Sequence, residues 1–370
     1  MSTLERIPPD EATQIANIIR LTRGQLEKRY PSGTMALRGQ HAKDHACVSG
    51  TLTVGNDIPQ DKRRGVFATP GQEYQIWVRY SNAAAAVGAD SIVAAAGAPP
   101  MHGGRGMAIK ILGVSGSPLL PTDGPAAQDF LMVNHPVFPF GNVEDYEAIT
   151  EVLAADNDNP ARFFAERIRK QADGSPDLAD PVTQRALRTL GIVRRVQSAS
   201  MTAQPPAYQL PPASPIDNQY FSAAPFLFGE DHVMRLRVTP TSPAASASPN
   251  VADPSYLRTA LLQRLTARDA QEVRFDFQAQ IRSAGELAGS VDIDIEDVSL
   301  QWDEAHHPFV TLAVIAIPPQ DFDTAERRAL CEALSFSPWH GIEDHRPLGG
   351  INRLRRAVYQ VSASFRQRSA

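Results

Sequence analysis

The 370-residue sequence has only two cysteines and no long apolar run. Cys47 and Cys331 are too few and too far apart to form a disulfide framework or a metal-binding motif. Nowhere do about eighteen apolar residues follow one another, and the N-terminal segment lacks the apolar core of a signal peptide. We therefore expect a cytoplasmic protein of a reducing compartment, without stable membrane insertion.

The sequence also has no excess of positive charge. Lys and Arg total 36 against 41 Asp and Glu, which gives a formal net charge of -5. A nucleic-acid-binding protein usually has a basic face and a high isoelectric point, so we expect no nucleic-acid partner. The chain is long enough for one large core or for two ordinary domains.

Strand-like and helix-like patterns alternate in blocks along the chain. Short β-branched or aromatic runs separated by Gly, Pro and Asn predict strands within 46–140. The remaining expected elements are helices over 10–29, 143–200, 254–269, 323–336 and the C-terminal segment, and strands over 272–283, 290–303 and 309–320. Proline-rich stretches over 204–215 and 239–250 predict surface connections. This order favours an α+β protein in which two strand blocks close into one antiparallel barrel around a helical insertion, although two separate domains remain possible.

A tyrosine lies close to arginines near the C-terminus. Arg355 and Tyr359 are four residues apart, which places them on one face of a helix. A neighbouring guanidinium favours the phenolate, and tyrosinate is one of the protein ligands of haem iron. The alternative is a buried tyrosine stacked on an arginine, and the spacing alone leaves both possibilities open.

Two histidines follow one another in RGQHAKDHA. His41 and His45 have the spacing of a metal-chelating pair on a helix, but no third ligand stands nearby, so the zinc signal is weak. Arg38 and Lys43 flank His41, and cations keep an imidazole neutral, which is the resting state of a general base. A surface or hydrogen-bonded histidine is the alternative.

Two further segments contain polar residues in strand-like surroundings. In VRYSN, a strand places Arg79 and Ser81 on one face and Tyr80 on the other. An arginine inside a barrel needs an anion, whereas an outward one would lie on a solvated face. Asn134 interrupts the apolar run DFLMVNHPVF, so its amide either caps a turn or points into a polar pocket.

Five motifs, in order, resemble the haem catalase superfamily, and more narrowly its short catalase-related peroxidases and hydroperoxide-metabolising domains. They are RGQHAK, VRYSN, RGMAIK, DFLMVNHPVF and HRPLGGINRLRRAVY. The resemblance covers about residue 30 to the C-terminus. It implies one catalase-like domain over 1–370, an antiparallel barrel of about eight strands with helices outside it. Its expected parts are an N-terminal helix (1–30), a first barrel half (30–140), a helical insertion with proline-rich connections (141–250), a second barrel half (251–320) and C-terminal helices (321–370).

The resemblance also implies a haem b site with roles for residues of this chain. Tyr359 matches the proximal iron ligand, and Arg355 the arginine that keeps it ionised. His41 matches the distal catalytic histidine, and Ser81 the hydroxyl that orients its ring. The residues expected to pair with haem propionates or to pack on the porphyrin are Arg38, Arg79, Arg366, Phe138 and Tyr146. Arg105 and Lys110 match the family strand without a chemical role.

Two positions depart from the family pattern. Catalases carry Asn-Asn-x-Pro, whereas this chain has Val133-Asn134-His135-Pro136, so Asn134 alone is left to supply the distal amide. Gln40 replaces a valine before the distal histidine, where a polar side chain could bind the imidazole or a peroxide.

The activity expected from the resemblance is that of a haem peroxidase. Gln40, and a chain that stops soon after Arg366, favour a more open pocket than that of a catalase. The expected substrates are hydrogen peroxide or organic hydroperoxides, reduced through a ferryl intermediate by a small-molecule donor, with weak catalase activity and a homodimer as a further possibility. The alternatives are a lipid-hydroperoxide isomerase or lyase, a haem-binding protein without turnover, and a non-haem, lipocalin-like binding module.

Overall fold

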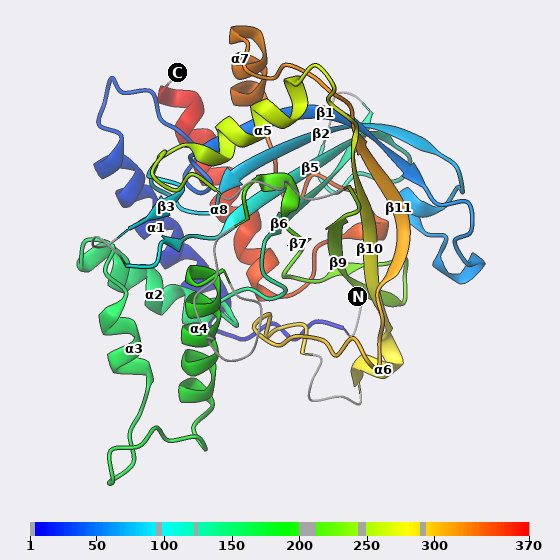
Figure 1. The fold of residues 1–370 in the computed structure, drawn as a ribbon. Helices are drawn as coiled ribbons and strands as arrows, with labels where there is room; N and C mark the ends of the chain where they lie inside the picture. The colour runs from blue at the N-terminus through cyan, green and yellow to red at the C-terminus, as the bar shows by residue number, and fades with distance from the viewer. Residues whose placement is uncertain are drawn as a thin grey trace.

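A computed structural model describes residues 4–93, 98–121, 125–199, 212–242, 249–288 and 294–369. Its centre is a closed antiparallel β-barrel (Figure 1). The barrel strands are β1 (Asp44–Val54), β2 (Glu73–Asn82), β5 (Arg105–Val114), β6 (Ala126–Val133), β7 (Tyr220–Phe221), β9 (His232–Pro240), β10 (Val273–Ser283) and β11 (Val310–Ile317). Three short strands lie beside them: β8 (Phe226–Leu227), β3 (Ser91–Ile92) and β4 (Met101–His102).

The order of the strands explains how the two halves of the sequence form one barrel. Neighbours follow the order β10, β11, β1, β2, β5, β6, β7 and β9, and the pairing of β9 with β10 closes the circle. The first and the second strand block therefore meet at the β1–β11 pair. Closure leaves no free barrel edge, which confirms the expected α+β barrel of about eight strands.

Alternation along the strands separates a packed interior from an outer face. On β2, Ile76, Val78 and Tyr80 are buried in the barrel core, at most 1% exposed. The residues that alternate with them face outward, among them Arg79 and Ser81. Both are nevertheless buried, at 3% exposure, because other segments cover this part of the barrel.

Eight helices are described, and Figure 1 places them outside the barrel, with α2, α3 and α4 gathered on one side. They are α1 (Glu11–Arg29), α2 (Val143–Ala155), α3 (Ala161–Arg167), α4 (Pro181–Gln197), α5 (Tyr256–Thr266), α6 (Ala284–Ala288), α7 (Ala325–Ala333) and α8 (Gly350–Ser369). Asp180 caps α4 by accepting a hydrogen bond from the Thr183 N–H, and Pro181 occupies the first turn. Helix α8 packs against α1 and α2. None of the described helices has both the length and the apolar character needed to cross a bilayer.

The structure differs from the sequence expectation in the second barrel half. Strands β7 and β9 already belong to the barrel, although they lie within 141–250, where only helices and connections were expected. In β9, Met234, Leu236 and Val238 alternate with polar or charged residues, a strand signal that the proline-rich flanks obscured.

The strand expected over 290–303 is also a correction. Residues 290–293 lie outside the described residues, and 294–303 form turns and loop. Asp294 Oδ1 accepts a hydrogen bond from the Glu296 N–H at 2.9 Å, and Asp297 Oδ1 accepts one from the Ser299 N–H at 3.0 Å. These aspartates bind their own backbone two residues on, which favours turns over a strand.

Candidate active site

Helix α8 carries the candidate iron ligand on its inner face. The Arg355 guanidinium carbon lies 5.7 Å from the centre of the Tyr359 ring, so the expected contact between the two side chains is present. Arg355 Nη1 also donates to Asn352 Oδ1 at 3.1 Å, which orients the guanidinium along the helix. The sequence spacing therefore gave the correct pair, one helical turn apart.

A half-buried ion-pair network fixes the start of α8. Arg353 pairs with Glu5 at 2.6 Å, with Glu11 at 2.6 Å and with Glu296 at 2.8 Å. Glu296 Oε2 also accepts a hydrogen bond from the Gly350 N–H at 2.7 Å. One arginine thus joins the N-terminal segment, α1 and the 294–303 loop to α8, so this helix holds a defined position.

His41 lies in the loop before β1 in an unusual backbone conformation. Its φ of 56° falls in the left-handed region, which costs energy for a residue with a side chain. Two contacts hold it there. Arg79 Nη2 donates to the His41 carbonyl oxygen at 2.9 Å, and His41 Nδ1 lies 3.0 Å from Ser81 Oγ. The expected His41–Ser81 pair is therefore formed.

The surroundings of His41 keep its ring neutral. Burial, which disfavours the charged imidazolium, is the main reason that the pKa of His41 falls to about 3. The positive charges of Arg79 and Arg355 lower this pKa further. When Nδ1–H donates to Ser81, Nε2 carries a free lone pair, so the ring can accept a proton at neutral pH.

The His41 segment is attached directly to α8. The Gly39 N–H donates to Ser362 Oγ at 2.9 Å, and Ser362 lies three residues after Tyr359 on the same helix. Arg355 acts on both candidate residues, since it contacts the Tyr359 ring and lowers the pKa of His41. The candidate base and the candidate iron ligand therefore belong to one site outside the barrel.

Gly106 forms part of the wall behind the His41 ring. In the β2–β5 register, Gly106 lies opposite Ser81, the residue that His41 contacts. A Cβ atom on Gly106 would lie 2.4 Å from His41 Nδ1 and 2.7 Å from Ser81 Oγ. Only glycine fits at this position, because any other residue would carry a Cβ atom that collides with His41 and Ser81. The sequence motif contained it, but nothing local indicated which distant side chain it would touch.

Asn134 lies at the end of β6, beside this wall. Its Oδ1 accepts a hydrogen bond from the Arg105 N–H at 2.7 Å, and the Asn134 N–H donates to the Arg105 carbonyl at 3.0 Å. The amide oxygen is thus anchored, and the NH₂ group is the end that can donate to a ligand. Asn134 therefore stabilises a backbone junction, and no hydrogen bond of its NH₂ group is found among the described residues.

Arg38, Arg79 and Arg366 lie close enough together to affect one another's charge. Arg38 Nη1 lies 3.1 Å from Glu332, and Arg366 Nη1 lies 3.8 Å from the same carboxylate. Burial lowers the pKa of Arg79 and of Arg366, and the charge of Arg38 lowers both further. Among the described residues, Arg79 Nε and Arg366 Nη1 are buried without a hydrogen-bond partner.

This cluster provides a test of whether the residues fit a haem. Within the described part of the chain, the ion pairs of these three arginines all go to Glu332, so positive charge is in excess. A ligand with two carboxylates would neutralise that excess and satisfy the unpaired donors. Haem has two propionates, and the cluster therefore fits the anionic edge of a haem.

An aromatic group lies beside α8. Phe138 and Tyr146 are stacked, with ring centres 6.1 Å apart, and both pack with Val358 of α8 in one apolar cluster. Burial raises the pKa of Tyr146 to about 12, and nearby Tyr359 adds to this effect. Tyr146 is therefore a neutral, apolar neighbour of Tyr359, suited to a flat hydrophobic ligand.

Three sequence expectations receive other roles. His45 lies within β1, where its Nε2 is 3.0 Å from Asn82 Oδ1, and no group of three metal-binding side chains occurs among the described residues. The two histidines therefore do not share a helix, and the weak zinc signal has no support among the described residues. Gln40 is exposed, without a described hydrogen bond to His41. Lys110 pairs with buried Asp129 at 2.7 Å, a structural role.

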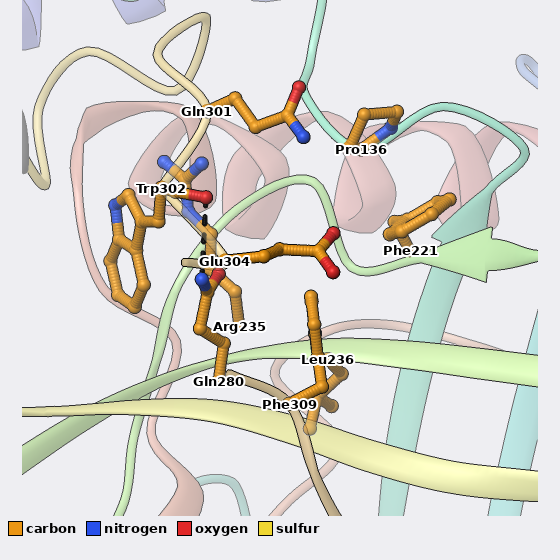
Figure 2. Close-up of a pocket in the computed structure, with 9 residues that line it drawn as sticks. All are labelled: Pro136, Phe221, Arg235, Leu236, Gln280, Gln301, Trp302, Glu304 and Phe309. Carbon is orange, nitrogen blue, oxygen red and sulfur yellow. Dashed lines mark hydrogen bonds between the residues drawn. The ribbon is translucent and has the colours of Figure 1, made fainter. Parts of the chain in front are cut away.

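A small cavity lies elsewhere on the barrel, under the loop around Trp302 (Figure 2). Its volume is about 10 Å³, enough for about one water molecule. Buried Arg235 lines it, with Nε and Nη2 lacking a hydrogen-bond partner among the described residues, and burial lowers the pKa of Arg235 to about 9. Sequence reasoning missed this arginine because it alternates with apolar residues like an ordinary solvated side chain. None of the candidate site residues lines this cavity.

Comparison with solved structures finds proteins of similar architecture. Models of known protein families and curated protein sequences give no match. A fungal catalase is similar with a TM-score of 0.59 at 16% identity, over 87% of this chain and 57% of that one. Catalase A from Saccharomyces cerevisiae gives 0.61 at 15% identity, over 90% and 61%. A bacterial catalase gives 0.57 at 14% identity, over 90% and 57%.

These comparisons establish the fold. The chain has a catalase-like fold, as the order of the sequence motifs implied. At 14–16% identity the likeness shows architecture alone, and the chain spans about three fifths of the length of these catalases.

Proposed function

We propose that this catalase-like chain binds haem b and acts as a peroxidase that reduces hydrogen peroxide or organic hydroperoxides, with weak catalase activity beside it. One observation carries the proposal. A neutral, half-buried histidine and an arginine-backed tyrosine lie on two segments that the Gly39–Ser362 hydrogen bond joins. A base on one segment and a tyrosine oxygen on the other is an arrangement that suits peroxide chemistry at haem iron.

Separate parts of the site would hold the cofactor. Tyr359 would provide the oxygen ligand, and the Arg355 guanidinium would hold its ring in place. The cluster of Arg38, Arg79 and Arg366 would bind the propionates, and Phe138 would contact the apolar ring. When bound, haem iron supplies the cleavage of the peroxide O–O bond and stores the oxidising equivalents that a donor later removes.

His41 and Asn134 would handle the proton and the leaving oxygen. His41 Nε2 would accept a proton from the peroxide and return it to the departing oxygen. Because the ring is neutral, no proton has to leave it first. The free Asn134 NH₂ group would donate a hydrogen bond to the departing oxygen, which stabilises its developing charge.

The first test is an absorption spectrum of the purified full chain after expression with ample haem supply. A Soret band is expected, together with peroxide-dependent oxidation of a small aromatic donor. Tyr359→Phe should retain little haem, because phenylalanine offers no oxygen ligand. His41→Ala should retain haem but react with peroxide about 10²–10⁴-fold more slowly, the usual contribution of a general base.

Three outcomes would overturn parts of the proposal. A colourless protein would remove the haem assignment. Native-rate peroxide reactivity in His41→Ala would show that another group is the base. Consumption of a fatty-acid hydroperoxide without any donor would replace the peroxidase by a hydroperoxide isomerase or lyase.

A further inference from the structure

A buried arginine on the barrel wall has an open hydrogen-bonding edge. Arg235 of β9 is 4% exposed, and its Nη1 donates to the Leu300 carbonyl oxygen at 2.5 Å. Its Nε and Nη2 are buried without a partner within the described part of the chain. On a planar guanidinium, the Nε–H and one Nη2–H point the same way and form an edge that binds an anion through two hydrogen bonds. The open edge of Arg235 is therefore an anion-binding edge.

Among the described residues, no acidic side chain forms an ion pair with Arg235. The charge of Asp297 acts on Arg235, but Asp297 pairs with Arg188 at 2.7 Å. Glu304 lines the same cavity as Arg235, but its Oε2 pairs with Arg237 Nη1 at 3.0 Å. Burial lowers the pKa of Arg235 to about 9, because a charge without a nearby counter-charge is costly to bury.

A second buried arginine adds to the positive charge. In the β9–β10 register, Arg235 lies opposite Gln280, and Arg282 follows two residues later on the same outer face. The guanidinium carbons of Arg235 and Arg282 lie 4.8 Å and 5.7 Å from the centre of the Trp302 ring. Arg282 is 5% exposed, and its Nε also lacks a partner among the residues described. Two like charges thus share one aromatic ring, an arrangement that a nearby anion stabilises.

The cavity that Arg235 lines has the size of one small particle (Figure 2). Its volume of about 10 Å³ gives room for about one water-sized particle. A water molecule can accept hydrogen bonds from the open edge, but it leaves the buried charge uncompensated. A chloride ion accepts the same hydrogen bonds and also carries the missing charge. Phosphate and organic carboxylates have several heavy atoms and are too large for this space.

We propose that this cavity is a binding site for one chloride-sized anion, held by the Nε–H and Nη2–H groups of Arg235 and favoured by the charge of Arg282. The bound anion fastens the 294–303 loop to the barrel, because Arg235 also holds Leu300 of that loop. Glu296 of the same loop pairs with Arg353 at the start of α8, at 2.8 Å. The anion therefore contributes to the stability of the fold, and the site does not rest on the proposed peroxidase activity.

The first test measures urea unfolding of the full-length protein at constant ionic strength, with sodium chloride replacing sodium gluconate, whose anion is too large for the cavity. Because chloride binds the folded chain alone, the unfolding constant should fall and then saturate in its approach to full occupancy, by about tenfold when chloride is at ten times its dissociation constant. Arg235→Met should remove this dependence, and Arg282→Met should weaken it. Arg274→Met is the matched control and should keep it, because Arg274 lies on β10 with an exposed side chain paired with Glu272.

Bromide can locate the ion. Crystals of the unmodified protein grown with sodium bromide should show an anomalous peak within hydrogen-bonding distance of Arg235 Nε and Nη2. This measurement needs no variant, so it decides the question even if Arg235→Met does not fold. The proposal is overturned if the open edge binds water or a carboxylate of the chain, or if chloride and gluconate give the same unfolding curve. A bromide peak without chloride-dependent unfolding would also overturn it, since that result marks an adventitious ion only.

Discussion

Replacing Gly106 by alanine is the sharpest perturbation of the candidate site. The new methyl group would lie 2.4 Å from His41 Nδ1, 2.6 Å from His41 Cε1 and 2.7 Å from Ser81 Oγ. To regain ordinary van der Waals separation, the imidazole has to move by about 1 Å. Such a movement breaks the 3.0 Å contact between His41 and Ser81, since the methyl group presses on both partners.

The size of the effect follows from that displacement. A misplacement of about 1 Å at a reacting group can lower a rate by about a hundredfold. Overpacking of this kind also lowers the free energy of unfolding by about 1–3 kcal/mol, so the variant should still fold. Gly106→Ala should therefore combine modest destabilisation with a large loss of peroxide reactivity.

The assay is stopped-flow mixing of the haem-loaded protein with peroxide, together with urea denaturation. Gly103→Ala is the matched control, because a Cβ atom there meets nothing within 4 Å. It should react and unfold like the original protein. If Gly106→Ala folds normally and reacts at the native rate, Gly106 does not position His41 and the reasoning is refuted.

Three further predictions use charge and pH. Because the pKa of His41 is about 3, the rate of the peroxide reaction should not fall between about pH 8 and pH 5. A fall in rate with a midpoint near pH 6.5 would contradict the assignment of His41 as a neutral base. His345 is fully buried, with its pKa lowered from 6.5 to about 4 by desolvation, so the unfolded chain binds the proton first as the pH falls. Its contribution to stability is complete above pH 6.5 and is lost between pH 6.5 and about 4, by at most about 3 kcal/mol in urea denaturation. His345→Gln should flatten that dependence, whereas the exposed His306→Gln should not. Arg353→Met should lower the free energy of unfolding by about 3–5 kcal/mol, because Glu11 and Glu296 lose their ion-pair partner and Glu5 keeps only Arg346. Arg356→Met on the same helix should lower it by less than about 1 kcal/mol. Equal losses in the two variants would refute the network's role.

Much of the fold could be predicted because its signals are local. The strand period of two on β2 and β5 and the helical spacing of 10–29 and 143–200 follow from residues close in sequence. The helical spacing of Arg355 and Tyr359 is local in the same sense. β9 was missed although its alternation is clear, and 294–303 was misassigned because aspartates there bind their own backbone instead of a neighbouring strand.

The candidate site could be predicted only where a motif already contained the residue. His41, Ser81 and Tyr359 were found by resemblance, and the structure brings their segments together. Glu332 was not found, since nothing near it in sequence indicates that Arg38 and Arg366 would meet it. Ion pairs between distant segments depend on packing that no local pattern encodes.

By itself, the sequence determined which segments become strands or helices and which face of each is apolar, because those properties depend on spacing along the chain. The tertiary structure alone decided that Arg79 is buried on the outside of the barrel and that Gly106 touches His41. These two facts depend on strand register and on which segments cover which strand. Both are properties of the closed barrel as a whole.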